Sequence, residues 1–555
     1  MDDQLAFGSE SRLSLWLHRV RFRLGFALLF LGCLWTVLDT LGITRDIFKH
    51  WRLFIQASVL VVVGFGLVAL VTTMPAFFRR FVGEATPGSL GAIRVLTCAI
   101  LLGDILIRDL ASSALLPSEM RLPMGLLQLF YSLPIGFEQF VGSETSLWAF
   151  KWVTALVLFL GMIGWRTRIM ICLGAFFYFL QNGILLQYLY FHHLGQVALY
   201  VMVVLSLLPC GDGWSVDRLR KVYKGRPVPD AERASPVYGW SRYACWVVVA
   251  LPYTAAGLSK LFNGGLYWWN ATNIKAILSG GALHQTWYDW GLALHPTSAP
   301  DTLFAFFGLT IILTELLFVT VLFSRIARRI LPSLMMMMHV GIFFLQNLLF
   351  LNLILLQFIF FDWTRIRKAV GRWLAARRSP IEVLYDGLCP FCQRSVRLLA
   401  RLDLFNRLEF VDFRRLDLRV YNRRHDLGIT LDDLEEEMYV ISRGRAYRGF
   451  YGYRVIALKL PALWPLAPWL FLPGATSLGG SAYRSVARNR FKLHQCDAHC
   501  PTEPLGTSGL TIVRRGKNVL GGLRYPLVVS ASAIVLFFCW FYRIALYPFT
   551  AMQMY

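Results

Sequence analysis

Residues 381–402 read IEVLYDGLCPFCQRSVRLLARL and decide the fold of the polar part of the chain. Ile381 to Tyr385 shows the alternation typical of a strand, and the stretch from Cys392 to Leu402 is helical in pattern. Cys389 and Cys392 therefore form a C-x-x-C motif directly after a strand and at the start of a helix. Because a helix N-terminus stabilises a thiolate, this placement predicts thiol-disulfide exchange.

The sequence around this motif predicts a small α/β domain over residues 380–505. Alternating strands are expected from Leu408 to Phe413 and from Met438 to Ser442. Arg443-Gly444 and the four prolines between 461 and 473 mark turns and loops. A Gly-rich and basic linker is expected at 506–524, before the last apolar segment, 525–555.

The composition of the whole chain is more apolar than that of a soluble domain. Of 555 residues, 56% are hydrophobic and 16% are charged, and the mean hydropathy is +0.52. An ordinary soluble domain has about a quarter of its residues charged, so the apolar excess must face a bilayer. The net charge of +23 falls in short clusters between apolar runs, which excludes a nucleic-acid-binding protein.

Ten runs of about 18 or more apolar residues are long enough to cross a membrane. We therefore expect a polytopic α-helical membrane protein with about ten transmembrane helices and the α/β domain inserted before the last of them. Residues 1–87 form a two-helix segment and residues 88–365 the main membrane domain; Met124 to Phe140 is expected to be interfacial or re-entrant. The runs are 24–41, 53–72, 90–107, 148–165, 168–186, 191–208, 244–261, 302–323, 334–361 and 525–548.

Basic residues in short loops predict which ends of the helices face the cytoplasm. The N-terminus and the basic loop from Arg218 to Arg242 are predicted to be cytoplasmic, in the cell membrane, and the first apolar run is an anchor and not a cleavable signal. Counting the predicted spans from the cytoplasmic N-terminus places residues 364–524 outside. This side is favoured because long domains translocate largely regardless of their charge. The basic residues that flank this block favour the cytoplasmic side instead. A hairpin within 331–361 would add a crossing and place the block in the cytoplasm.

The stretch from Tyr385 to Cys392, with Phe410-Val411-Asp412 and the late motif from Tyr483 to Arg490, resembles the DCC family of thioredoxin-like thiol-disulfide oxidoreductases. The resemblance implies that Cys389 attacks, that Cys392 resolves, that the two form a redox-active disulfide and that Asp386 lies near them. Thioredoxins usually place a cis-proline before the strand that faces the dithiol, where this chain has Glu437-Met438. We therefore expect a different handling of the substrate.

A second cysteine pair, Cys496 and Cys500, lies beside His494 and His499 at the end of the block. Its spacing suits a relay dithiol, a structural disulfide or half of a zinc site completed by the first pair. No metal site is predicted from these alternatives. The six cysteines in apolar runs are expected to act as small hydrophobic side chains.

Ionisable residues inside apolar runs are costly and mark either internal ion pairs or functional sites. They are Arg94, Asp104, His193, Lys260, Glu315 and His339. These residues and the motifs around them resemble the HTTM transmembrane domain shared with vitamin K-dependent gamma-carboxylase. The motifs lie at 88–94, 209–217 and 256–261, and the last apolar run of the domain ends at Asp362-Trp363. The resemblance covers residues 88–365 and implies that Lys260 is the base that deprotonates a vitamin K hydroquinone, assisted by His193.

Two features depart from the carboxylase pattern. The histidine segment reads Tyr190-Phe191-His192-His193 and lacks two asparagines, and a dithiol domain stands where the carboxylase has a large substrate domain. The leading hypothesis is a membrane-integral oxidoreductase that couples a quinone or vitamin K-like hydroquinone near Lys260 and His193 to the dithiol. Alternatives are a gamma-glutamyl carboxylase-like enzyme, an anchored thiol oxidoreductase or maturation factor for exported proteins, and a non-catalytic transporter or immunity-type protein. The expected partners are membrane lipids, a lipid quinone, and an exported protein or peptide substrate or a redox partner.

Overall fold

The structure is a computed structural model that describes residues 64, 66, 74–123, 125–188, 195–230, 233–282, 300–346, 348–377, 380–489 and 519–541. The chain divides into two compact units. The smaller unit consists of Val216–Asp230 and Asp362–Arg514, and the larger unit contains the rest of the chain. Apart from residues 64 and 66, the two predicted N-terminal spans lie outside the described residues.

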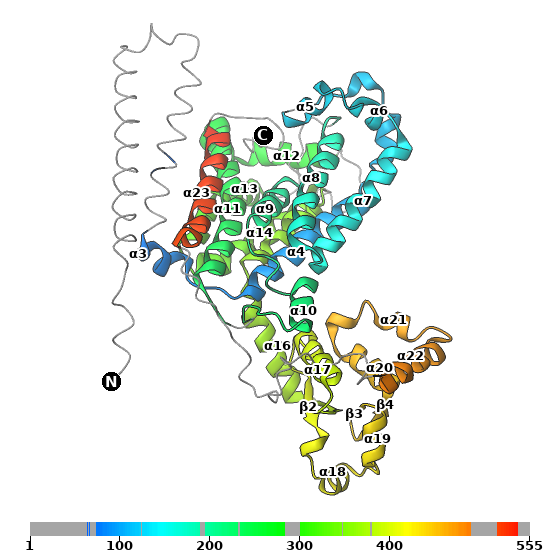
Figure 1. The fold of residues 1–555 in the computed structure, drawn as a ribbon. Coiled ribbons are helices and arrows are strands. Elements are labelled where there is room, and N and C mark those ends of the chain that lie inside the picture. Colours follow the sequence, from blue (N-terminus) through cyan, green and yellow to red (C-terminus); the bar gives the residue numbers. More distant parts are fainter. Residues whose placement is uncertain are drawn as a thin grey trace. The chain divides into compact units, whose positions relative to one another are not determined.

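The larger unit is helical in all of its described elements (Figure 1). Helix α11 runs through its core and packs against α4, α9, α13 and α23. The elements are α3 Pro75–Phe77, η1 Phe78–Val82, α4 Pro87–Ile107, η2 Ala111–Leu115, η3 Ser118–Met120, α5 Leu126–Ser132, α6 Phe137–Val141, α7 Glu144–Ile163, α8 Thr167–Leu186, α9 Gln196–Ser206, α11 Pro236–Gly264, η4 Gly265–Tyr267, α12 Ala271–Ala282, α13 Asp301–Leu317, η5 Phe318–Leu322, α14 Ala327–Gln346, α15 Leu351–Leu356, η6 Gln357–Phe360 and α23 Val519–Phe541.

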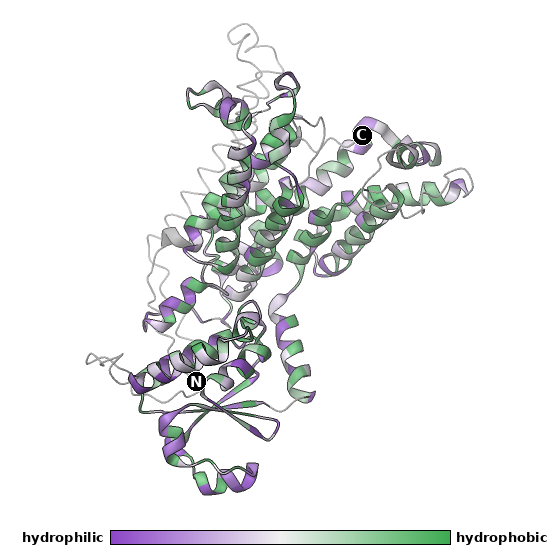
Figure 2. Ribbon diagram, turned by 90° about the vertical axis from the view of Figure 1, so that its right-hand side faces the viewer, coloured by the Kyte–Doolittle hydropathy of each residue, from purple (hydrophilic) through white to green (hydrophobic). Residues whose placement is uncertain are grey.

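Six helices of the larger unit are long and apolar enough to cross a membrane, and Figure 2 shows how apolar residues dominate them. They span Pro87–Ile107, Glu144–Ile163, Thr167–Leu186, Pro236–Tyr267, Asp301–Leu322 and Ala327–Leu345. A largely helical chain with membrane-length helices is therefore confirmed, whereas ten spans are not. Three further apolar helices, Gln196–Ser206, Leu351–Phe360 and Arg524–Phe537, are 10–17 residues long in the described part of the chain.

The run at 334–361, predicted as one span, is two helices. Helix α14 ends at Gln346, and α15 begins at Leu351. Between the two helices the sequence has the polar pair Gln346-Asn347, and asparagine is a poor helix former. The stretch at 124–140, predicted to be interfacial or re-entrant, contains the two short helices α5 and α6.

The smaller unit is the predicted α/β domain, built on a mixed sheet of four strands in the order β2-β1-β3-β4 (Figure 1). Strand β1 is parallel to β2 and antiparallel to β3, and β3 and β4 form a hairpin. Its elements are α10 Val216–Tyr223, α16 Trp363–Arg377, β1 Ile381–Tyr385, α17 Pro390–Leu402, β2 Leu408–Asp412, η7 Phe413–Arg415, α18 Leu418–His425, α19 Leu431–Glu436, β3 Tyr439–Ser442, β4 Arg445–Arg448, α20 Gly449–Lys459, η8 Pro461–Leu463, α21 Ala467–Leu470 and α22 Ala475–Asn489.

Helices cover both faces of this sheet. Leu399 of α17 and Ile456 of α20 pack on one face, beside Val383 and Val440. Tyr421 of α18 and Leu434 of α19 pack on the other face. Both faces are therefore apolar, which fits the nearly continuous apolar pattern of β1 and β3.

Helix α10 belongs to the smaller unit although it lies between two apolar helices of the larger one in the sequence. It packs against α17, the helix that begins at the C-x-x-C motif. A segment more than a hundred residues upstream thus completes the surroundings of the dithiol helix.

Candidate active site

The dithiol lies at the turn from β1 into α17, as the sequence predicts. Cys389 is the N-cap of α17, and its sulfur accepts a hydrogen bond from the backbone N–H of Cys392 at 3.3 Å. Pro390 occupies the first turn, where its missing N–H costs nothing. A thiolate at Cys389 therefore receives both a direct N–H bond and the positive end of the helix dipole.

The two sulfurs differ in exposure. Cys389 is completely buried, whereas Cys392 is partly exposed. The helix N-terminus favours Cys389 as the nucleophile, and accessibility favours Cys392. An attack by Cys389 therefore requires a local movement that exposes its sulfur.

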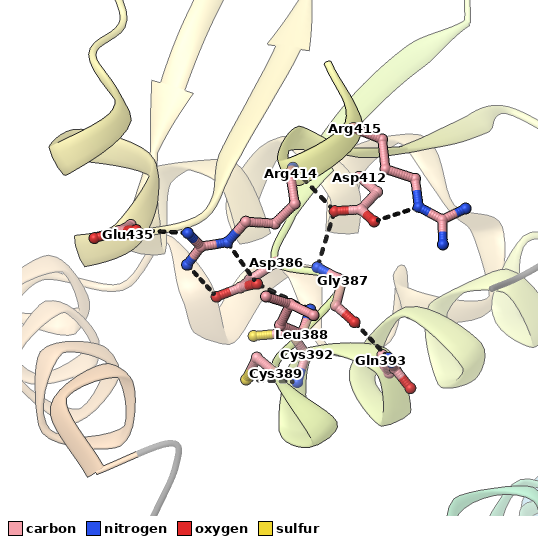
Figure 3. A network of polar contacts seen from close by, with 10 residues as sticks. All are labelled: Asp386, Gly387, Leu388, Cys389, Cys392, Gln393, Asp412, Arg414, Arg415 and Glu435. Atoms are coloured by element: carbon pink, nitrogen blue, oxygen red, sulfur yellow. Dashed lines mark hydrogen bonds and ion pairs between the residues drawn. The ribbon is translucent and has the colours of Figure 1, made fainter. Parts of the chain in front are cut away.

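The buried carboxylate of Asp386 fixes the loop before the dithiol (Figure 3). The guanidinium of Arg414 donates Nε and Nη2 to its two oxygens, each at 3.2 Å, and Nη1 to Glu435 at 2.6 Å. The N–H of Leu388 donates to Asp386 Oδ1 at 3.0 Å. Hydrogen bonding to Asp386 is the largest influence on Arg414 and raises the pKa of its guanidinium. Since Arg414 occupies both oxygens, Asp386 serves as an anchor of the loop.

A second carboxylate holds Gly387. Asp412, at the end of β2, accepts the N–H of Gly387 at 3.0 Å and that of Arg414 at 3.1 Å (Figure 3). A Cβ on residue 387 would overlap the Asp412 carboxylate, so only glycine fits there. The Gln393 amide donates to the Gly387 carbonyl from the first turn of α17. The loop is thus fixed from β2, η7 and α17 at once.

Two tyrosines lie near Cys392. Burial, and then the neighbouring Cys392, raise the pKa of Tyr453 to about 12, so its phenol stays protonated at neutral pH. Burial also raises the pKa of Tyr483, whose hydroxyl accepts the N–H of Met438 at 2.8 Å. The Met438 carbonyl accepts the N–H of Gly449 at 2.9 Å. Both backbone groups of Met438, the residue before β3, are therefore engaged.

Replacing Arg414 with Met is expected to destabilise the dithiol loop. The variant leaves the Asp386 carboxylate buried without its ionic partner, which costs about 1–3 kcal/mol of unfolding free energy. Amide hydrogen exchange of residues 381–412 in the full chain measures this loss.

The matched control is Arg415→Met. Arg415 contacts Asp412 at 3.5 Å and has 66% of its side chain exposed, so its loss is expected to change stability by about 0.5 kcal/mol or less. Equal effects of the two variants would contradict the anchoring role of Asp386.

A dithiol at the N-terminus of a helix that follows a buried strand, held by a paired carboxylate, defines the site of a thiol-disulfide oxidoreductase domain. The comparison with protein families agrees, because residues 383–496 match the family of DCC1-like thiol-disulfide oxidoreductases. No curated protein and no solved structure matches the chain. The resemblance of residues 88–365 to the carboxylase stays a prediction.

The larger unit brings two of the predicted membrane residues together. Nζ of Lys260 donates to both oxygens of Glu315, at 2.7 and 2.6 Å, and lies 5.2 Å from the centroid of the Trp268 ring. The side chains are 5% and 2% exposed, so the pair is buried between α11 and α13. A Cβ at Gly257 would lie 2.9 Å from Glu315 Cβ, which shows how closely these helices approach.

His339 belongs to a second buried group. Its Nε2 lies 3.2 Å from the hydroxyl of Tyr253, which accepts the Gln357 amide at 2.9 Å. Nδ1 of His339 and Oε1 of Gln357 are buried and have no hydrogen-bond partner among the residues that the structure describes. These side chains come from α14, α11 and η6, and they include two residues, Tyr253 and Gln357, that the sequence analysis did not select.

Arg94 and Asp104 lie on the same helix, α4, and have separate partners. Arg94 is fully buried and donates to the carbonyls of Cys210, Gly213 and Trp214 at 2.6, 3.1 and 2.6 Å. Asp104 pairs with Arg108 at 3.0 Å and accepts the Tyr178 hydroxyl at 2.7 Å. Both residues therefore connect α4 to its neighbours.

Three predicted residues, His193, Cys496 and Cys500, lie outside the described part of the chain. Arg414 and Tyr453 were missed near the dithiol. Tyr483 begins the late motif from Tyr483 to Arg490, and its bond to Met438 gives that motif a structural role. No periodicity or spacing would have found Arg414 or Tyr453, since the fold alone brings them to the site.

Proposed function

We propose that this chain is a membrane-anchored thiol-disulfide oxidoreductase whose active pair is Cys389 and Cys392. The observation that carries the proposal is the position of Cys389 as N-cap of α17, with its sulfur bonded to the N–H of Cys392. The family match over residues 383–496 supports it.

The chemistry balances as a two-electron exchange. The Cys389 thiolate attacks one sulfur of a substrate disulfide, forms a mixed disulfide and releases the other substrate sulfur as a thiolate. The Cys392 thiolate then attacks the Cys389 sulfur and releases the second substrate thiolate. The substrate disulfide is reduced to two thiols, and the enzyme is left with a Cys389–Cys392 disulfide; the reverse sequence oxidises a substrate dithiol.

The experiment is a redox titration of the full chain in lipid nanodiscs. The protein is equilibrated in buffers with a graded ratio of reduced to oxidised glutathione, and is then alkylated and digested. Mass spectrometry measures the mass of the peptide that contains both cysteines. We expect Cys389 and Cys392 to convert together between dithiol and disulfide. Independent glutathione adducts with no disulfide between the two would refute the proposal.

A second function, the coupling of the dithiol to a quinone, is favoured by the buried pair of Lys260 and Glu315 with Trp268 beside it. We propose that a quinone headgroup binds there, with the Lys260 ammonium as hydrogen-bond donor and with His339 and Tyr253 nearby. Two enzyme thiols would give two electrons and two protons to the quinone and form one disulfide and one hydroquinone.

The carboxylase-like alternative receives less support. There Lys260 acts as a base, which needs a free lone pair on Nζ, whereas Nζ donates to both oxygens of Glu315. A base at this site would first have to transfer its proton to the carboxylate.

We infer that the dithiol faces the cytoplasm. Helix α10 begins in the basic loop that the sequence predicts to be cytoplasmic, and it packs on α17 within one compact unit. Segments packed together lie on the same side of a membrane. A hairpin at the break between α14 and α15 would reverse the count of spans and agree with this side. We therefore propose the cytoplasmic side, in place of the outside position that counting the spans favoured.

Labelling of Cys392 tests this sidedness, because its side chain is partly exposed. A membrane-impermeant maleimide is expected to modify Cys392 in inside-out vesicles and, in right-side-out vesicles, only after detergent is added. Modification in intact right-side-out vesicles would place the dithiol outside, where an exported protein becomes the favoured substrate.

A further inference from the structure

The smaller unit has an exposed apolar surface away from its strands. Between η8 and the start of α22, large apolar side chains face solvent, and we call this the tryptophan face. It consists of Trp464, Leu466, Trp469, Phe471, Leu472 and Leu478. Trp469 is 69% exposed and Leu478 is 76% exposed. So many large apolar side chains together mark an interaction site.

The tryptophan face is held in place by specific contacts. Arg454 of α20 donates Nε to the Leu470 carbonyl at 2.9 Å, and its guanidinium lies 4.3 Å from the centroid of the Phe471 ring. The Trp464 indole N–H donates to the Leu458 carbonyl at 3.2 Å. These bonds tie the loop to α20 while the apolar side chains stay exposed.

The charged residues within the segment that carries this face are of one sign. Residues 449–489 contain Arg454, Lys459, Arg484 and Arg488 and no Asp or Glu. Most of the acidic residues of the unit lie instead between Asp403 and Glu437. Tryptophans with basic residues and without acidic ones are typical of a segment that lies at the interface of an anionic bilayer.

The way the chain enters and leaves the unit favours a bilayer over another partner. Helix α16 begins three residues after η6 ends at Phe360, and α23, with Arg524–Phe537 apolar, follows the unit. Both ends therefore continue into apolar helices, so lipid is always at high local concentration.

We propose that the tryptophan face inserts into the headgroup region of the membrane and binds anionic lipid through the basic residues of α22. Trp464, Trp469 and Leu478 supply the buried apolar area, and Arg484 and Arg488 meet the lipid phosphates. The domain that carries the dithiol is then held at the surface of the bilayer. This binding does not depend on the redox chemistry proposed for Cys389 and Cys392.

The test places a photo-crosslinking residue, p-benzoylphenylalanine, at single positions of the full chain in nanodiscs. Trp469 and Leu478 report the tryptophan face. Val420 and Leu431, which are 53% and 48% exposed in the same unit, are matched controls on the other helices. After irradiation, mass spectrometry separates adducts with lipid from adducts with protein.

We expect lipid adducts at positions 469 and 478, and few at 420 and 431, in discs with phosphatidylglycerol. Replacing both Arg484 and Arg488 with Gln is expected to lower the yield by up to roughly thirtyfold, as the loss of two surface cations near anionic lipid predicts. Adducts with protein at 469 and 478, from this chain or from a second copy, would overturn the proposal, as would equal lipid yields at all four positions. A yield unaffected by the arginine variant would overturn the role of anionic lipid.

Discussion

Cys392→Ser is expected to trap a mixed disulfide between Cys389 and a disulfide-bonded substrate. The variant retains the proposed nucleophile and lacks the thiol that resolves the intermediate, so turnover should fall to the rate of the uncatalysed exchange. A model peptide disulfide is mixed with the protein in nanodiscs, and the adduct is located by mass spectrometry. Cys389→Ser should give neither turnover nor adduct.

Cys389 is assigned as the nucleophile because its thiolate is stabilised, and not because its sulfur is accessible. The Cys389 sulfur accepts the Cys392 N–H at the helix N-terminus, although the residue is buried and Cys392 is partly exposed. Should the adduct form instead in Cys389→Ser, through Cys392, the two roles would be reversed.

Cys172→Ser is the matched control for both variants. Cys172 is an exposed cysteine on α8, in the larger unit and outside the dithiol loop. Its replacement should leave turnover and trapping unchanged. A loss of activity in this variant would show that cysteines outside the C-x-x-C motif take part.

Lys260→Met is expected to destabilise the larger unit by about 3–5 kcal/mol, because it leaves the Glu315 carboxylate buried without its partner. The double variant Lys260→Met/Glu315→Leu removes both charges and should recover the wild-type stability or exceed it. Unfolding of the purified proteins in mixed micelles of rising SDS content measures both effects. If the double variant lost as much stability as the two single variants together, the two charges would not depend on each other.

The same double variant separates a quinone site from a structural pair. Under anaerobic conditions, menaquinone should oxidise Cys389 and Cys392 in the wild type. The stable double variant should lose this response and still exchange with glutathione. A full quinone response in the double variant would refute a role of Lys260 in quinone binding and leave the dithiol chemistry standing.

Local patterns predicted much of the smaller unit. Strand β1 has the predicted bounds, and α17 follows the C-x-x-C motif as expected. Strand β4 was not predicted. It is an exposed edge strand, and Arg445 and Arg448 break the alternation of apolar and polar residues that would have indicated it. Its pairing depends on the turn at Arg443 and Gly444, where φ is 54° and 73°, as a tight hairpin requires.

Contacts between distant residues could not be predicted in the same way. Lys260 and Glu315 were each selected as costly charges, but 55 residues separate them and only the packing of α11 on α13 pairs them. Arg414 reaches Asp386 from the segment after β2, which is a consequence of the parallel pairing of β1 and β2. Hydropathy did not reveal that the run at 334–361 is two helices, because the apolar content of a run does not show where a helix ends.

The position of α10 in the sequence has a consequence for biosynthesis. Pro390, the first residue of α17, follows Tyr223, the last of α10, by 167 residues. At 5–20 residues per second, α10 leaves the ribosome on the order of ten to thirty seconds before its partner exists. During that interval several apolar helices must enter the bilayer. The dithiol domain can therefore be completed only after the apolar helices that precede it have been made, so the dithiol site forms later than those helices.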